Sequence, residues 1–148
     1  FGVGKTSLIR RFVHQKFSDQ YLTTIGVKVD RKEVEVEGQA LTLMIWDIAG
    51  EANLSKVSQQ YLLGAHGLIY CLDLSRRETF ENLQEDLFEL TKNLGDVPIL
   101  ILGNKADLLT QEEQLAITKE ITLSVTLTSA KTGDNVDATF DEMARLLL

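Results

Sequence analysis

The apolar residues near the start of the chain lie at helical spacing. Leu8, Ile9, Phe12 and Val13 occupy positions i, i+1, i+4 and i+5, which places them on one face of a helix. The pattern follows directly after Gly4-Lys5-Thr6, so we predict that a helix begins there. This helix should bury its apolar face against the rest of the chain.

Residues 27–47 alternate apolar and polar side chains, which predicts two strands joined by a turn centred on Gly38. In the first strand the valines occupy odd positions before Arg31 and even positions after it. Because side chains in a strand alternate between two faces, this change of phase predicts a bulge or a sharp twist near Arg31. The glutamates between the later valines predict a solvated edge strand.

Three later segments have the pattern of strands in a parallel sheet. The runs GLIYCLDL at 67–74 and PILILGNK at 98–105 are typical of strands buried on both faces. The segment ITLSVTLTSA at 121–130 is rich in threonine and valine, which favours a third strand.

Helices are predicted between and after these strands. The capping pattern Ser75-x-x-Glu78 predicts the start of a helix whose apolar stripe ends at Gly95. A second capping pattern, Thr110-x-x-Glu113, predicts a shorter helix. Residues 136–147 carry the apolar stripe of a last helix.

Together these elements predict an α/β fold. A helix, a hairpin and then alternating strands and helices should form a three-layer sandwich around a mostly parallel sheet, with one antiparallel edge hairpin strand. No repeat or long linker interrupts the pattern, so we predict that residues 1–148 form one domain. A composition of 44% hydrophobic and 25% charged residues fits this class.

Charge and cysteine content narrow the class of function. The formal net charge of −7 argues against a broad nucleic-acid surface but allows a local basic pocket for a phosphorylated small molecule. The single cysteine, Cys71, lies inside an apolar run and is expected to fill the core of a protein in a reducing, cytoplasmic compartment. No carboxy-terminal cysteine is present for prenylation, so we expect no lipid anchor within these residues.

Candidate binding residues fall at the carboxyl ends of the predicted strands, where open parallel sheets bind their ligands. Asp47, Asn104 and Ser129 each lie at or near such an end. Gly4-Lys5-Thr6 matches the second half of the phosphate-binding loop G-x-x-x-x-G-K-[ST], whose first glycine would precede Phe1. The tripeptide alone does not establish a phosphate-binding loop, so this interpretation depends on the residues at the ends of the predicted strands.

The segment Asn104-Lys105-Ala106-Asp107 indicates which base such a site would bind. A carboxylate at Asp107 can accept hydrogen bonds from the N1–H and the 2-amino group of guanine. Adenine has an acceptor at N1 and no amino group at position 2, so it would leave the carboxylate unpaired and repelled. At the end of a buried strand, downstream of GKT and WDIAG, the motif favours guanine.

The ordered motifs GVGKTS, TTIG, WDIAGE, NKAD and TSAK resemble the Ras-like small GTPases. Trp46 before Asp47, and the segment YLLGAHGLIYCLDLSRRETFENL, are most similar to the Rab branch, and the similarity covers essentially the whole chain. The resemblance implies a P-loop NTPase fold and a molecular switch with GTP-bound and GDP-bound shapes. It also implies a strand before the phosphate loop, in the middle of the sheet. We therefore expect the chain to be a fragment, truncated before or within that loop.

The resemblance implies roles for individual residues at the phosphates. Backbone N–H groups would point at the phosphates from Gly2, Val3, Gly4, Lys5, Thr6 and Ser7. Lys5 would reach the β- and γ-oxygens, and Thr6 would ligate Mg²⁺ while Asp47 held the ion through water. Thr24 would join the metal only in the triphosphate state, with Thr23 as the alternative.

At the base, the resemblance implies that Phe17 lies edge-on against the guanine, with a plain core position as the alternative. Lys105, between Asn104 and Ala106, would cover one face of the base. The other side would be supported by Ser129, Ala130 and Lys131, the last of which has a surface position as its alternative.

Two residues depart from the family pattern. Gly50 would meet the γ-phosphate through its N–H, and the next position carries Glu51 where the family has Gln to orient the attacking water. An ionised carboxylate cannot donate to the γ-oxygens, and its charge opposes theirs. With Lys5, Gly50 and Glu51 as the catalytic residues, we expect slow hydrolysis with GTP binding retained. Phe1 replaces a small residue close to the γ-phosphate and could obstruct an arginine from an activating partner.

The leading hypothesis is a GTPase switch that recruits partner proteins. Effectors, exchange factors and GTPase-activating proteins would bind the switch regions around 18–30 and 50–62. The alternatives are a pseudo-GTPase scaffold that binds nucleotide without turnover and a Roc-type GTPase module of a larger protein. NKAD and TSAK argue against a P-loop kinase or ATPase. We expect a cytoplasmic location, with membrane attachment only through partners or residues outside the printed sequence.

Overall fold

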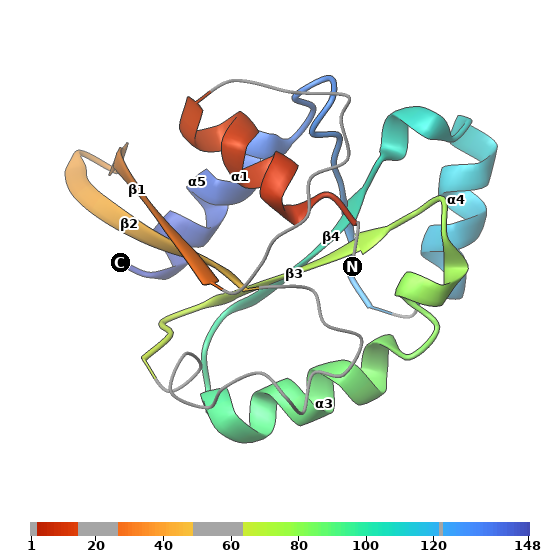
Figure 1. Ribbon diagram of the computed structural model, residues 1–148, viewed down its shortest axis with the longest axis horizontal. Helices are drawn as coiled ribbons and strands as arrows, with labels where there is room; N and C mark the ends of the chain where they lie inside the picture. Colours follow the sequence, from red (N-terminus) through yellow and green to blue (C-terminus); the bar gives the residue numbers. More distant parts are fainter. Residues whose placement is uncertain (1–2, 15–26, 49–63, 122) are drawn as a thin grey trace.

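The computed structural model describes residues 3–14, 27–48, 64–121 and 123–148 (Figure 1). The regular elements in these residues are α1 (Lys5–His14), β1 (Val27–Val36), β2 (Gln39–Ile48), β3 (Leu68–Asp73), α3 (Leu83–Leu94), β4 (Ile99–Asn104), α4 (Gln111–Glu120), β5 (Thr126–Leu127) and α5 (Val136–Leu146). Two 3₁₀ turns, η2 (Arg77–Thr79) and η3 (Ala106–Leu108), lie after β3 and β4. Within the same residues, no helix combines the length and the apolar character that crossing a membrane requires.

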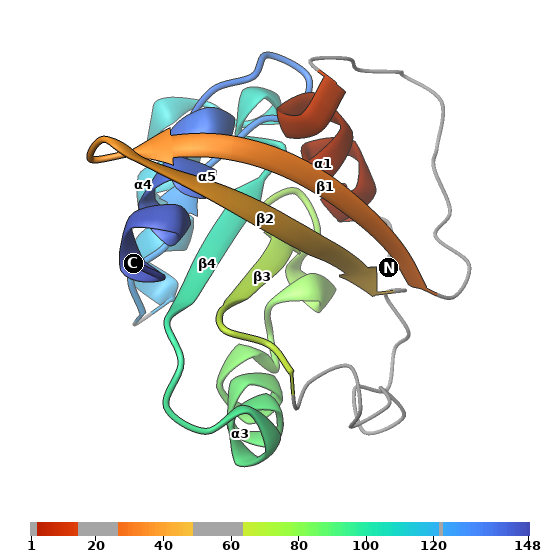
Figure 2. The same ribbon diagram turned by 90° about the vertical axis from the view of Figure 1, so that its left-hand side faces the viewer.

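The parallel strands lie between two layers of helices. β3, β4 and β5 pair in that order, with α1 and α5 side by side on one face and α3 on the other (Figures 1 and 2). On the α1 side the rings of Phe12 and Phe140 stack with centroids 4.1 Å apart. On the α3 side Leu72, Phe80 and Leu83 belong to a second apolar cluster. The predicted three-layer α/β arrangement is confirmed.

The hairpin forms a sheet of its own. β1 and β2 pair with each other, and no strand ladder joins them to β3–β5 among the described residues. The hairpin is attached through side chains instead, because Val36 and Leu43 pack in one apolar cluster with Leu8 and Phe12 of α1. The α/β class stands, while the strands fall into two sheets where the sequence predicted one.

Of the bulge or sharp twist predicted near Arg31, the bulge is wrong, and the twist stays a prediction. The two strands pair one residue to one from Val27 to Val36. Their turn, as predicted, is at Gly38, where Glu37 and Gly38 have φ of 52° and 78°, the signs that a two-residue hairpin turn of type I′ requires. The valines change faces because Val29, which is 40% exposed, lies on the outer face opposite Trp46. An apolar partner across the strand, not an extra residue, accounts for the change of phase.

Two predicted capping patterns have different outcomes. Thr110 forms the predicted capping box with Glu113 at the start of α4. The Ser75 hydroxyl instead donates to the Asp73 carboxylate, and the chain turns through η2 before α3 begins at Leu83, so the capping box predicted there is wrong. α3 does end at Gly95, as expected.

The third parallel strand is much shorter than the predicted 121–130. Only Thr126–Leu127 pair with β4 as β5. Two backbone bonds continue the contact beyond the ladder, since the N–H of Thr128 donates to the Gly103 carbonyl and that of Ala106 donates to the Thr128 carbonyl. The carboxyl ends of β4 and β5 therefore stay side by side although the strand itself is brief.

Candidate functional site

The amino terminus of α1 presents the phosphate loop. Gly4 precedes the helix with φ of 96°, and its carbonyl accepts from the N–H of Leu8 at 2.8 Å. The first N–H groups of a helix have no acceptor within the helix, so the amino-terminal end of a helix such as α1 suits an anion. A Cβ at Gly4 would also collide with Nδ2 of Asn104, so both the backbone angle and the packing require glycine.

Asn104 joins this loop to two other segments. Its Nδ2 donates to the Val3 carbonyl at 2.9 Å, and its Oδ1 accepts from the Thr128 hydroxyl and the Ala130 N–H, each at 3.3 Å. The side chain is 1% exposed, so water hardly competes for these bonds. The structure thus places Asn104, a predicted nucleotide-binding residue, as a fixed bridge within the protein.

The predicted metal ligands Thr6 and Asp47 meet across 41 residues of sequence. The Thr6 hydroxyl donates to Asp47 Oδ2 at 2.6 Å, and the Lys5 ammonium lies 3.7 Å from Oδ1. Asp47 is 3% exposed. A hydroxyl and a carboxylate are hard oxygen donors of the kind that Mg²⁺ prefers, so these residues fit the ion that the sequence predicts.

A second carboxylate is fixed at the opposite end of the site. The Ser129 hydroxyl donates to Asp107 Oδ1 at 2.7 Å and accepts from the Thr132 N–H at 3.1 Å. Asp107 lies in η3 directly after β4, and Ser129 lies directly after β5. The two predicted base-binding segments are therefore brought together. The Lys131 side chain is exposed, while its carbonyl accepts from Arg11 at 3.4 Å.

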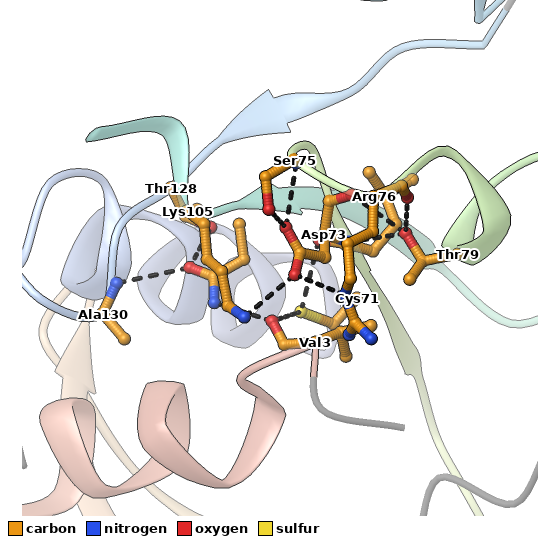
Figure 3. A network of polar contacts seen from close by, with 11 residues as sticks. Val3, Cys71, Asp73, Ser75, Arg76, Thr79, Lys105, Thr128 and Ala130 are labelled. Carbon is orange, nitrogen blue, oxygen red and sulfur yellow. Dashed lines mark hydrogen bonds and ion pairs between the residues drawn. The ribbon is translucent and has the colours of Figure 1, made fainter. Parts of the chain in front are cut away.

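Sequence reasoning missed Asp73, which lies at the centre of the network of polar contacts in Figure 3. This carboxylate is completely buried and lies 2.9 Å from both the Lys105 ammonium and Nε of Arg76. Burial raises its pKa, but hydrogen bonds from Ser75, Lys105 and Arg76 outweigh burial and hold the pKa below its ordinary value of 3.8. Arg76 is therefore part of this network. Asp73 could have been found as Asp47 was, because it is also a polar residue at the carboxyl end of a strand, β3.

Cys71 supports the same corner of the molecule by packing. Its side chain contacts the α1 cluster, and its Sγ lies 3.9 Å from the Val3 carbonyl. Burial raises the pKa of the thiol to about 12, so it stays protonated at neutral pH. The predicted role of a core residue is confirmed.

The sequence matches the Ras family over residues 1–148. It is 35% identical to Ras-related protein Rab-13 of Canis lupus familiaris, covering 99% of this chain and 75% of the relative. It is 33% identical to Ras-related protein SEC4 of Saccharomyces cerevisiae (99% and 70%) and 36% identical to GTP-binding protein YPTM2 of Zea mays (97% and 73%). The chain belongs to the Ras family. The resemblance predicted from the motifs is confirmed, and the fold is that of a Ras-family P-loop GTPase.

Ras-family proteins are small GTP-binding switches. The structure places Val3 against Asn104 and Asp107 against Ser129. The roles expected of these residues at the phosphates and at the base stay predictions. Five predicted site residues lie outside the described residues, and their roles stay predictions: Gly2, Phe17, Thr24, Gly50 and Glu51. Most of both switch regions lies outside the described residues as well.

Proposed function

We propose that this Ras-family chain is a guanine-nucleotide switch that binds GTP or GDP with Mg²⁺ and hydrolyses GTP slowly. The observation that supports it most is the double attachment of Asn104, which bonds the phosphate loop at Val3 and the base-side loop at Ala130. A nucleotide needs its pyrophosphate site and its base site at a fixed separation. One buried side chain that bonds both loops supplies that separation.

Base recognition falls to Asp107. Ser129 fixes one carboxylate oxygen by a 2.7 Å hydrogen bond, which orients the group before a ligand arrives. An ionised carboxylate accepts about four hydrogen bonds, so it can also accept the N1–H and 2-amino hydrogens of guanine. Adenine cannot supply these donors, and its N1 acceptor would face the carboxylate, which makes its binding unfavourable.

Phosphate binding falls to the start of α1. Lys5 brings positive charge to the amino-terminal end of the helix, and Thr6 and Asp47 place two oxygen ligands beside it. Bound Mg²⁺ neutralises charge on the phosphate oxygens during phosphoryl transfer. In the described structure the Thr6 hydroxyl donates to Asp47, which keeps both oxygens together.

Slow hydrolysis follows from Glu51 in place of glutamine. At about 5 Å and an effective dielectric constant of 20, a unit negative charge repels another by roughly 3 kcal/mol. If none of that repulsion is relieved, it lowers the rate by about two decades. The γ-phosphate still meets Lys5, so binding is retained while turnover is slow.

Partner recruitment is supported by the outer face of the hairpin. Val29, Met44 and Trp46 are all exposed, and Val29 pairs directly with Trp46. β1 begins inside the first predicted switch region, at Val27, and β2 ends at Ile48, just before the second. An apolar patch next to segments that change with the nucleotide suits effectors, exchange factors and activating proteins that respond to the switch.

The first test identifies the nucleotide that copurifies with the protein. Extraction by denaturation followed by chromatography should yield GDP, because a slow GTPase still converts its ligand during purification. Extracted GTP with no GDP would support the scaffold alternative instead. Extracted ATP or ADP would contradict guanine recognition.

The second test measures GTP turnover in the parent protein and in Glu51→Gln. The variant should be faster by up to about 100-fold, because it removes the charge and restores a donor. Glu37→Gln, which neutralises an exposed glutamate on the hairpin turn, is the matched control and should turn over like the parent. A parent faster than Glu51→Gln contradicts the electrostatic argument.

A further inference from the structure

Asp73 accepts four hydrogen bonds with one completely buried carboxylate. Its Oδ1 accepts from the Ser75 N–H at 2.9 Å and from the Ser75 hydroxyl at 2.6 Å. Its Oδ2 accepts from Arg76 Nε and from the Lys105 ammonium, each at 2.9 Å (Figure 3). These contacts use about all four acceptor positions that a carboxylate has.

Lys105 is fixed at both ends by the protein. Its backbone adopts the left-handed conformation with φ of 63° and ψ of 31°, which is uncommon for a residue with a long side chain. Its ammonium is fixed by Asp73, two thirds of the side chain being covered. The methylene stem between these two fixed points therefore has a defined position, two residues before the base-reading carboxylate of Asp107.

We propose that Asp73 is a positioning residue of the nucleotide site: it draws the Lys105 ammonium into the protein so that the methylene stem forms one wall of the base pocket. The inference rests on the proposed function. With the charge turned inward, this wall contacts any purine equally well, and the choice of base stays with Asp107.

Arg76 makes this arrangement depend on the charge of Asp73. Two nitrogens that each lie 2.9 Å from one oxygen are at most about 6 Å apart, so the two cations repel each other and the charge of the carboxylate between them offsets that repulsion. Asparagine at position 73 has one acceptor oxygen and no charge, and it cannot hold both. Arg76 would then push Lys105 away from its position.

The turn after β3 could also affect the site only by stabilising the fold. A control variant has to separate this structural effect from the positioning of Lys105. The Thr79 hydroxyl accepts from the Asp73 N–H at 3.0 Å and can donate to one of two nearby carbonyls, that of Asp73 at 2.9 Å or that of Arg76 at 2.7 Å. Thr79→Val removes this support for the turn without touching the carboxylate. It should lower the melting temperature and leave the rate of nucleotide release within about twofold of the parent.

The experiment measures dissociation of a ribose-labelled fluorescent GDP from the parent, Asp73→Asn, Arg76→Gln, the double variant and Thr79→Val. Asp73→Asn should release GDP about tenfold faster or more, because Lys105 loses its fixed position beside the base and changes within one binding site act mainly on the rate of release. The affinity ratio of GDP to IDP, which lacks the 2-amino group, should stay that of the parent. In the double variant the repelling cation is gone, so release should return to within about threefold of the parent.

Three results would overturn the proposal. The first is a parental release rate in Asp73→Asn, and the second is a double variant no slower than Asp73→Asn. If Asp73→Asn does not fold, Arg76→Gln decides: it leaves Lys105 as the remaining cation on Oδ2, so release more than about threefold faster than the parent contradicts the proposal. A parent that binds no GDP is a separate result, which refutes the proposed function itself and the inference with it.

Discussion

Replacing Asn104 with alanine removes the amide that ties the phosphate loop to β4 and to the loop after β5. The Val3 carbonyl loses its donor and the Ala130 N–H loses its acceptor, while the Thr128 hydroxyl keeps a contact with the Gly103 carbonyl at 3.5 Å. Val3 and Ala130 are both buried, so water cannot easily replace the amide. Each orphaned group costs roughly 1–3 kcal/mol, so the free energy of unfolding should fall by about 2–6 kcal/mol.

Such a loss is large beside a typical stability of about 5–15 kcal/mol, so it should be plain in urea unfolding followed by circular dichroism. The midpoint should fall while the slope stays the same, because the surface exposed on unfolding does not change. Asn82→Ala is the matched control, since Asn82 is exposed and its side chain makes no capping bond. It should stay within about 0.5 kcal/mol of the parent.

A second substitution separates the lost donor from the lost volume. Asn104→Asp keeps the size and the acceptor but faces the Val3 carbonyl with a second oxygen, so it should destabilise the protein at neutral pH at least as much as alanine does. The reasoning fails if Asn104→Ala costs less than about 1 kcal/mol, or if Asn104→Asp is as stable as the parent.

Three further predictions concern the loop, the helix cap and pH. Gly4→Ala should abolish tight GDP binding in a titration, because its Cβ collides with Asn104; retained affinity contradicts the packing argument. Thr110→Ala should cost about 1 kcal/mol in urea unfolding through loss of the capping box, and no measurable loss refutes the role of the cap. Because the folded pKa of Asp73 is depressed, its stabilisation is complete above about pH 5 and is lost as pH falls from 3.8 toward the lower folded value. Melting temperatures between pH 6 and pH 3 should therefore fall more steeply for the parent than for Asp73→Asn; parallel curves count against it.

The sequence predicted which strand ends meet, because the topology of a parallel sheet decides it. Asn104, Asp107 and Ser129 follow β4 and β5, and the carboxyl ends of adjacent parallel strands lie at one edge. The resemblance placed Thr6 and Asp47 at one metal ion, and the structure brings the two side chains within 2.6 Å of each other. Such contacts can be predicted because each motif has a fixed spacing along the chain and a fixed position in the fold.

The sequence did not predict features that depend on a distant partner. The Ser75 hydroxyl could cap a helix or bind Asp73, and the cations Arg76 and Lys105 on the buried carboxylate accompany the second choice. The phase of the valines around Arg31 had the same ambiguity, since only the position of Trp46 across the strand shows that Val29 stays on the outer face. The local pattern of apolar and polar residues does not indicate that Ser75 binds Asp73 or that Val29 pairs with Trp46.

The most direct test of guanine recognition is a competition between GDP and XDP for the parent and for Asp107→Asn. Xanthine carries a carbonyl at position 2 where guanine carries an amino group, so the carboxylate should favour GDP and the amide, which can donate, should favour XDP. We predict that the preference reverses between the two proteins. An Asp107→Asn variant that still prefers GDP, or a parent that binds ADP as tightly as GDP, would contradict the assignment of this carboxylate to the base.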